Sequence, residues 1–177
     1  NAQSISIVFS DSTKGWIPVS DDAVADVPVA PATQKAIIGY GGNSSGTSKA
    51  NLVNSSGVIA SDITITGQDR DYLAATSYGG DKAAFAYGYN GSTQVNTKNL
   101  VNSSGVIAAD VTGVGTARDL LAAASYGGDK AVFAYGYAGG VLSTKNLVNN
   151  AGVIGSDVSG VGTARNYVIA AGYSLSA

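Results

Sequence analysis

Residues 119–165 decide the fold, because their sequence, DLLAAASYGGDKAVFAYGYAGGVLSTKNLVNNAGVIGSDVSGVGTAR, closely repeats that of residues 71–118. Each copy spans about 47 residues, the length of one supersecondary unit in a repeat protein. An earlier copy, residues 34–70, lacks only the opening segment, and residues 166–173, NYVIAAGY, match that opening segment alone. The two partial copies complement one another and make three units in total. We expect the series to close, either within one chain or between chains.

Each unit is expected to hold four short strands separated by turns, which predicts an all-β fold. In the last unit the four strands are expected at residues 120–126, 131–137, 145–149 and 153–158. Gly127 and Gly128 supply the positive φ angles of a tight hairpin between the first two. In the second strand, alternation predicts that Phe133, Tyr135 and Tyr137 share one face. Aromatic and β-branched residues with frequent glycine favour strands over helices throughout.

Four strands in about 47 residues is the size of one blade of a β-propeller. The unit also resembles the kelch family of blades, since Arg118 precedes a Leu-Leu-Ala-Ala-Ala segment and Phe133-Ala-Tyr-Gly-Tyr runs into Gly139-Gly140. It departs from that family in lacking the usual Trp and in the early position of its Gly pairs. Three blades are fewer than the four to eight that close a propeller, so two chains could complete a six-bladed ring. A β-trefoil or β-prism with internal threefold symmetry is the alternative.

The composition restricts the chemistry more than any motif does. Charged residues make up 12% of the chain and the net charge is −2, which argues against binding to nucleic acid. No apolar run approaches the roughly 18 residues of a membrane span. The chain has no His or Cys, and all its acidic residues are Asp, so a catalytic triad and the usual zinc, copper and haem sites lack their side chains. We therefore predict no enzymatic activity, no cofactor and no metal.

Two sets of residues recur once per unit and invite a functional interpretation. Asp62, Asp110 and Asp157 would suit a repeated Ca²⁺ site, but no cluster of neighbouring acids accompanies them. The second set comprises three arginines, which are expected to pair with Asp or with carbonyl groups between neighbouring sheets: Arg70, Arg118 and Arg165.

Tyr89 and Tyr137 are the candidate ligand-binding residues. An aromatic face stacks on a sugar ring, and the phenol hydroxyl adds a hydrogen bond. The first unit has Gly42 at the same position, so the fold itself does not demand Tyr there. These residues support an alternative function, a lectin-like module that binds surface carbohydrate.

Residues 1–32 lie outside the repeat and are expected to precede the three-repeat domain of residues 33–177 as a strand segment and linker. Residues 4–9 alternate like a strand, and a turn leads into a second strand at residues 16–18. Residues 21–33 contain Pro28 and Pro31, which disfavour both helix and central strand, so this stretch is expected to be a linker.

The front segment and the repeats together resemble structural proteins of marine, cyanophage-like tailed bacteriophages, especially tail fibres and related virion appendages. The matching residues are Val8-Phe-Ser-Asp-Ser-Thr-Lys-Gly-Trp16 and the Tyr-Gly-Gly-Asp-Lys-Ala segments that begin at Tyr78 and Tyr126. The resemblance implies a place on the virion surface, outside the cell. It also implies assembly with other copies and other virion proteins, and a contribution to host attachment through a surface glycan. It provides no catalytic residues.

Overall fold

The computed structural model describes residues 7–18, 34–42 and 46–173, and among them it contains strands and turns but no helix. The prediction of an all-β repeat fold is confirmed. Contacts divide the chain into two units, Asn1–Thr33 and Gln34–Ala177. The linker expected at residues 21–33 lies outside the described residues, as does the beginning of the strand expected at residues 4–9.

The first unit contains a two-stranded antiparallel hairpin of β1 (Ile7–Asp11) and β2 (Gly15–Pro18). Phe9 pairs with Trp16 across the hairpin, and their ring centroids lie 5.5 Å apart. The Asp11 carboxylate accepts hydrogen bonds from the backbone N–H groups of Lys14 and Thr13, at 2.7 and 2.8 Å, which lower the pKa of Asp11. The turn is thus held by a side chain that replaces the missing backbone partners.

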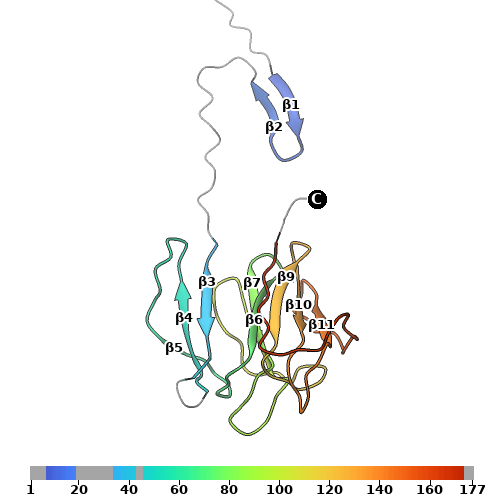
Figure 1. Cartoon of the computed structure of the whole chain (residues 1–177). Coiled ribbons are helices and arrows are strands. Elements are labelled where there is room, and N and C mark those ends of the chain that lie inside the picture. The colour runs from blue at the N-terminus through green and yellow to red at the C-terminus, as the bar shows by residue number, and fades with distance from the viewer. Residues whose placement is uncertain (1–6, 19–33, 43–45, 174–177) are drawn as a thin grey trace, which may run out of the picture. The chain divides into compact units, whose positions relative to one another are not determined.

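Three separate three-stranded antiparallel sheets form the second unit, one sheet for each sequence repeat (Figure 1). The first sheet consists of β3 (Ala36–Gly39), β4 (Lys49–Val53) and β5 (Ile63–Thr64). The second consists of β6 (Ala74–Tyr78), β7 (Lys82–Ala86) and β8 (Lys98–Val101). The third consists of β9 (Ala122–Tyr126), β10 (Lys130–Ala134) and β11 (Lys145–Val148).

The first sheet differs from the other two because it lacks an opening strand equivalent to β6 and β9. β7 and β10 are central strands, flanked by the first and third strands of their own repeats. Their equivalent in the first repeat, β3, lies at the edge of its sheet and pairs only with β4. This matches the sequence prediction that residues 34–70 lack only the opening strand.

The expected fourth strand of the last unit is reduced to two isolated bridges, Val148 with Ile154 and Lys145 with Val158. Between these bridges the Asn146 side chain forms two hydrogen bonds with the outer segment. Its Nδ2 donates to the carbonyl of Gly155 at 3.0 Å and to the carboxylate of Asp157 at 2.9 Å. The asparagine at the same place in each repeat makes the same pair of bonds, which add to backbone bonds such as that from the Gly155 N–H to the Leu147 carbonyl in holding the outer segment.

The alternation predicted for residues 131–137 holds only as far as Ala134, where β10 ends. Tyr135 adopts a φ of 64°, in the left-handed region that non-glycine residues seldom occupy. The prediction that Phe133, Tyr135 and Tyr137 share one strand face is therefore wrong beyond Phe133. The reason is that β10 ends at Ala134 and the backbone turns through the left-handed region at Tyr135, which breaks the two-residue alternation of a strand.

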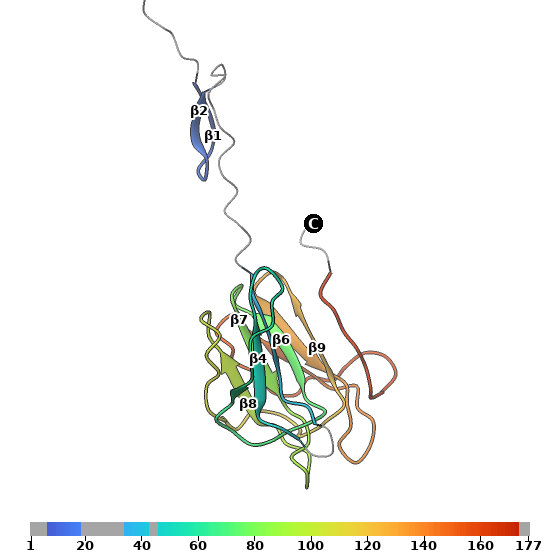
Figure 2. The same ribbon diagram turned by 90° about the vertical axis from the view of Figure 1, so that its left-hand side faces the viewer.

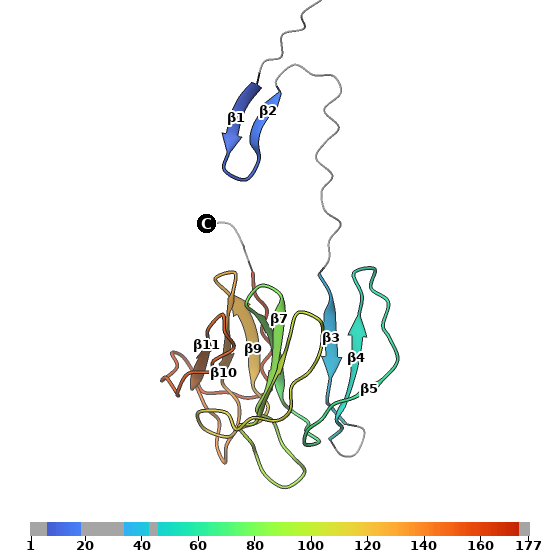
Figure 3. The ribbon, with the colours of Figure 1, turned by 180° about the vertical axis from the view of Figure 1, so that it is seen from behind.

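The three sheets follow one another in chain order, with the second between the first and the third (Figures 1 and 3). Viewed from the side of the first sheet, β4 lies in front of β6 and β9 (Figure 2). The core lies between the second and third sheets, where β6 runs beside β9 and small alanines face the rings of Tyr87 and Phe133. Burying one such aromatic ring stabilises the fold by about 2–3 kcal/mol.

Candidate functional site

The recurring polar residues lie between successive sheets, so the junction between sheets is the candidate site. At the end of each repeat the guanidinium of an arginine lies over the ring of a tyrosine in the same repeat. The three pairs, with the distance from Cζ to the ring centroid, are Arg70 on Tyr40 at 4.5 Å, Arg118 on Tyr87 at 4.1 Å and Arg165 on Tyr135 at 4.0 Å. A cation over an aromatic face is an attractive arrangement whose strength grows as water is excluded.

Arg70 extends from the first repeat into the second sheet. Its Nη1 donates hydrogen bonds to the carbonyl groups of Tyr87 and Thr97, at 2.9 and 2.8 Å, and its Nη2 donates to the side-chain oxygen of Asn99. The residue is completely buried. A buried cation requires such partners, because an unpaired charge in the interior costs several kcal/mol.

Arg118 makes the equivalent contact with the third sheet. Its Nη2 donates to the carbonyl of Phe133 at 3.4 Å, and its Nη1 lies 4.0 Å from the carboxylate of Asp157. Burial lowers the pKa of Arg118, whereas Tyr87 and Asp157 oppose that shift. The prediction that these arginines pair with carbonyls and Asp between neighbouring sheets is confirmed for Arg70 and Arg118.

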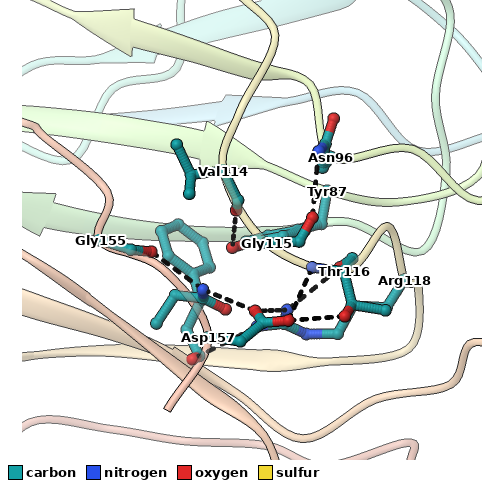
Figure 4. Close-up of polar contacts among 10 residues, drawn as sticks. Tyr87, Asn96, Val114, Gly115, Thr116, Arg118, Gly155 and Asp157 are labelled. Atoms are coloured by element: carbon teal, nitrogen blue, oxygen red, sulfur yellow. Dashed lines mark hydrogen bonds and ion pairs between the residues drawn. The ribbon is translucent and has the colours of Figure 1, made fainter.

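An Asp latch completes each junction from the other side (Figure 4). The Asp157 carboxylate accepts hydrogen bonds from the backbone N–H and the hydroxyl of Thr116, at 3.0 and 2.6 Å. At the first junction Asp110 accepts the backbone N–H of Gln68 at 2.8 Å. Burial alone would raise the pKa of Asp157, but the bonds from Thr116 and Asn146 and the charge of Arg118 outweigh it and lower that pKa.

A third contact joins the second and third sheets at their turns. Tyr78, at the end of β6, lies against Gly152, where an added Cβ would come within 2.8 Å of the tyrosine ring. The backbone N–H of Gly79 donates to the carbonyl of Asp129 at 2.7 Å. The junction between the second and third repeats therefore has three parts: an arginine that extends forward, an aspartate latch that extends back, and a tyrosine over a glycine turn.

Tyr89 and Tyr137, the predicted ligand-binding residues, occupy equivalent places just after the central strands. Tyr89 exchanges backbone hydrogen bonds with Asp71, at 2.9 and 3.0 Å, and Tyr137 does the same with Asp119, at 2.9 and 3.1 Å. Both tyrosines are half-buried. Two cavities of the described chain, of about 450 and 240 Å³, are lined by other residues. A role for these two tyrosines in ligand binding stays a prediction.

The carboxyl groups beside these tyrosines lie in a poorly solvated environment. Asp119 is buried, and burial raises its pKa, with the nearby Asp71 acting in the same direction and a hydrogen bond with Gln94 opposing them. In the described part of the chain no group of three or more acidic side chains is placed to hold a metal ion.

Asn99 and Asn146 are the site residues that sequence reasoning missed. Both are completely buried, and each ties the outer segment of its repeat to the Asp latch. Their signal in the sequence is the Lys-Asn-Leu-Val segment, which occurs in the second and third units at residues 98–101 and 145–148.

In the described segments no helix could serve as a membrane span. No protein-family model matches the chain, and no curated protein matches it either.

Proposed function

We propose that this chain is a non-enzymatic structural protein of a virion appendage, such as a tail fibre, and that it works by assembly with other copies and other virion proteins. The observation that carries this proposal is the use of its recurring polar residues. Arg70, Arg118, Asp110 and Asp157 all bond to the neighbouring repeat, so the side chains that could have formed a repeated reactive site hold the fold together.

The location follows from the resemblance to tail fibres of marine phages, carried by the Val8 to Trp16 segment and the Gly-Gly hairpins after Tyr78 and Tyr126. We propose a location at the virion surface, outside the cell, where a contribution to host attachment fits. The sheets are interpreted as propeller blades, because each is an antiparallel meander in chain order and the first strands of the second and third sheets, β6 and β9, run side by side.

The test is to look for the protein on particles. Virions produced from the source of this sequence are purified on a density gradient and examined by peptide mass spectrometry and by immunogold labelling. The expected result is its peptides in the virion fraction and gold at an appendage. Peptides found in the cell lysate and absent from virions would refute the proposal.

A glycan array tests the alternative of a lectin-like module. Binding of a defined glycan that is lost in Tyr89→Ala or Tyr137→Ala, by a protein absent from virions, would favour that alternative. Glycan binding by a protein present on virions would instead assign it a share in host attachment.

A further inference from the structure

We propose that a second copy of this chain closes the repeat series, with residues 166–173 of each copy adding to β3 of the other as its missing first strand. The product is a ring of two chains. This inference rests on the proposed role in assembly and names the partner. It is argued from two surfaces: the open first face (β3, Gly57 and Asp62) and the open third face (Tyr126, Tyr135 and residues 162–173).

Residues 166–173 have the position of a first strand without strand partners. Tyr167 donates its backbone N–H to the carbonyl of Leu120 at 3.0 Å, as Leu120 does to Tyr72 at 2.9 Å. Tyr167 and Leu120 also share a φ near 54° and 53°. The segment therefore starts the next step of the series, yet within the described residues it pairs with no strand. β3 lacks a strand of this kind on its free edge.

The register follows from the two complete sheets. In these, Ala74 pairs with Ala86 and Ala122 with Ala134. At the equivalent positions of the two open faces stand Ile169 and Gly39. A large residue opposite glycine thus takes the place of a pair of alanines. Ile169 is 97% exposed in the single chain.

The open third face has a cavity that a side chain of the open first face, Ile38, would fill. The cavity, about 450 Å³, is lined by Ala122–Ala124, Tyr135, Arg165 and Ile169, among others. At the internal junctions this place is filled by Phe85 against Tyr40 and by Phe133 against Tyr87, with ring centroids 5.2 and 5.5 Å apart. The equivalent of these phenylalanines in the first sheet is Ile38, which is 55% exposed.

The polar parts of the junction are divided between the same two faces. Asp62 accepts a bond from Asn51 in its own repeat, as Asp110 does from Asn99, but in the described chain no preceding repeat reaches it. On the open third face, the loop of Gly162 meets only the Tyr135 hydroxyl, 3.9 Å from an added Cβ, whereas the equivalent Gly115 lies against Asp157. Arg165 follows that loop, so Asp62 of one copy and Arg165 of the other bring opposite charges together.

The tyrosine and its glycine turn are divided in the same way. Tyr78 is 4% exposed because it covers Gly152, whereas Tyr126, at the end of β9, is 42% exposed. The equivalent turn of the first sheet contains Gly57, with a φ of 79° and no atom within 4 Å of an added Cβ. Tyr126 of one copy would therefore cover Gly57 of the other.

The number of copies follows from the number of units. Propellers close with about four to eight blades. The three units of residues 34–173 are fewer than four, and three copies of them make nine, whereas two copies make six. Two identical junctions related by a twofold axis then leave no face unpaired, which is the usual condition for a closed oligomer.

The experiment combines solution mass with engineered cross-links in a chain that has no cysteine of its own. Light scattering of the wild-type protein should give twice the 17.6 kDa of one chain. The inferred register sets Ala170 opposite Ile38, so the double variant Ile38→Cys, Ala170→Cys should form a disulfide-linked dimer on oxidation. Ile38→Cys with Ala171→Cys is the matched control, because its second cysteine lies on the other strand face and should not cross-link.

A wild-type monomer, a trimer or larger assembly, or a cross-link confined to one chain would each overturn the inference. Dimers that form equally with Ala171→Cys would overturn it as well, because the register would then be wrong. The proposed function fails separately: a dimer absent from virions refutes the location and leaves the ring standing, whereas a monomer on virions does the reverse.

Discussion

At the residue scale, the recurring charged side chains stabilise the contacts between neighbouring repeats. A buried guanidinium between a tyrosine ring and a set of carbonyl groups is costly to desolvate and is stabilising only when all its partners are present. The Asp latch behaves likewise, since Asp157 accepts hydrogen bonds from two neighbouring residues of other segments, Thr116 and Asn146.

Asp157→Asn should therefore destabilise the fold at neutral pH. Loss of a carboxylate that accepts charge-assisted bonds costs about 1–3 kcal/mol. The pKa of Asp157 is lowered in the folded state, so its contribution is present above the ordinary value of 3.8 and is lost as the pH falls through the lower folded value. Thermal melts should show a lower Tm for the variant at pH 7 and a difference that shrinks below pH 4.

Asp81→Asn is the matched control, because Asp81 sits in an exposed hairpin where its pair with Lys82 is solvated. It should change the unfolding free energy by less than about 1 kcal/mol. Equal effects from Asp81→Asn and Asp157→Asn would contradict the account of the latch.

Asp119→Asn should have the opposite effect. Burial raises the pKa of Asp119, which means that the folded state disfavours the charged carboxylate. The wild type gains stability as the pH falls through that raised value, so the variant should melt a few degrees higher at pH 7 and lose its advantage in acid. The last opening segment, residues 166–173, already has Asn166 at the position equivalent to Asp119. A variant that melts lower at pH 7 would show that the carboxylate is needed there.

The residue-scale predictions from sequence succeeded where recurrence and charge coincided. Three arginines spaced by one unit indicated contacts between sheets, and two of them make such contacts. The sequence did not single out the buried asparagines, because Asn is abundant in the turns of this chain. The hydrogen bonds of Asn146 are made to residues about ten positions further on, which a local pattern does not show. Only the folded arrangement distinguishes that asparagine from its many neighbours.

At the element scale, hydrophobic alternation and glycine pairs were sufficient to predict the first three strands of a repeat and the absent opening strand of the first one. They could not predict where the second strand ends. Tyr40, Tyr87 and Tyr135 all have φ near 63–66°, a conformation that sequence rules reserve for glycine and asparagine. In this conformation each tyrosine ring lies against an arginine about 30 positions downstream, a contact that local sequence patterns do not reveal.

Gly57→Ala tests the turn that we expect Tyr126 of a second copy to cover. In the single chain the new methyl group meets nothing, so its only internal cost is the positive φ. In the ring it would collide with the tyrosine at both junctions, and overpacking of about 1–3 kcal/mol at each junction raises the dissociation constant by roughly 30-fold or more. Sedimentation velocity over a dilution series measures this change.

Gly91→Ala supplies the control for Gly57→Ala. Gly91 also has a positive φ and open surroundings, but it lies in an exposed loop of the second repeat. Its substitution should leave the dissociation constant within about twofold. If both variants weaken the dimer equally, backbone strain rather than contact with Tyr126 is responsible.

At the scale of the whole molecule, stability should depend on protein concentration. A fold whose first sheet is completed and whose third sheet is covered by another copy gains stability by mass action. Differential scanning calorimetry of the wild type should show a Tm that rises with each tenfold increase in concentration. The cysteine-linked Ile38→Cys, Ala170→Cys dimer should show a Tm that does not move with concentration. A concentration-independent wild-type Tm would contradict closure between chains.

The first unit lacks its opening strand, and residues 166–173 supply a segment equivalent to it. This arrangement has a consequence for how the gene can change. Residues 71–118 and 119–165 are nearly interchangeable, so unequal recombination between their coding segments would add or remove one whole unit. Either event would leave β3, Gly57 and residues 166–173 unchanged, and both segments carry tyrosines at the positions of Tyr126 and Tyr135. Two-chain rings of four or eight blades would result, both within the range that closes. The number of blades in the ring could therefore change in evolution while the contact between the two copies stays the same.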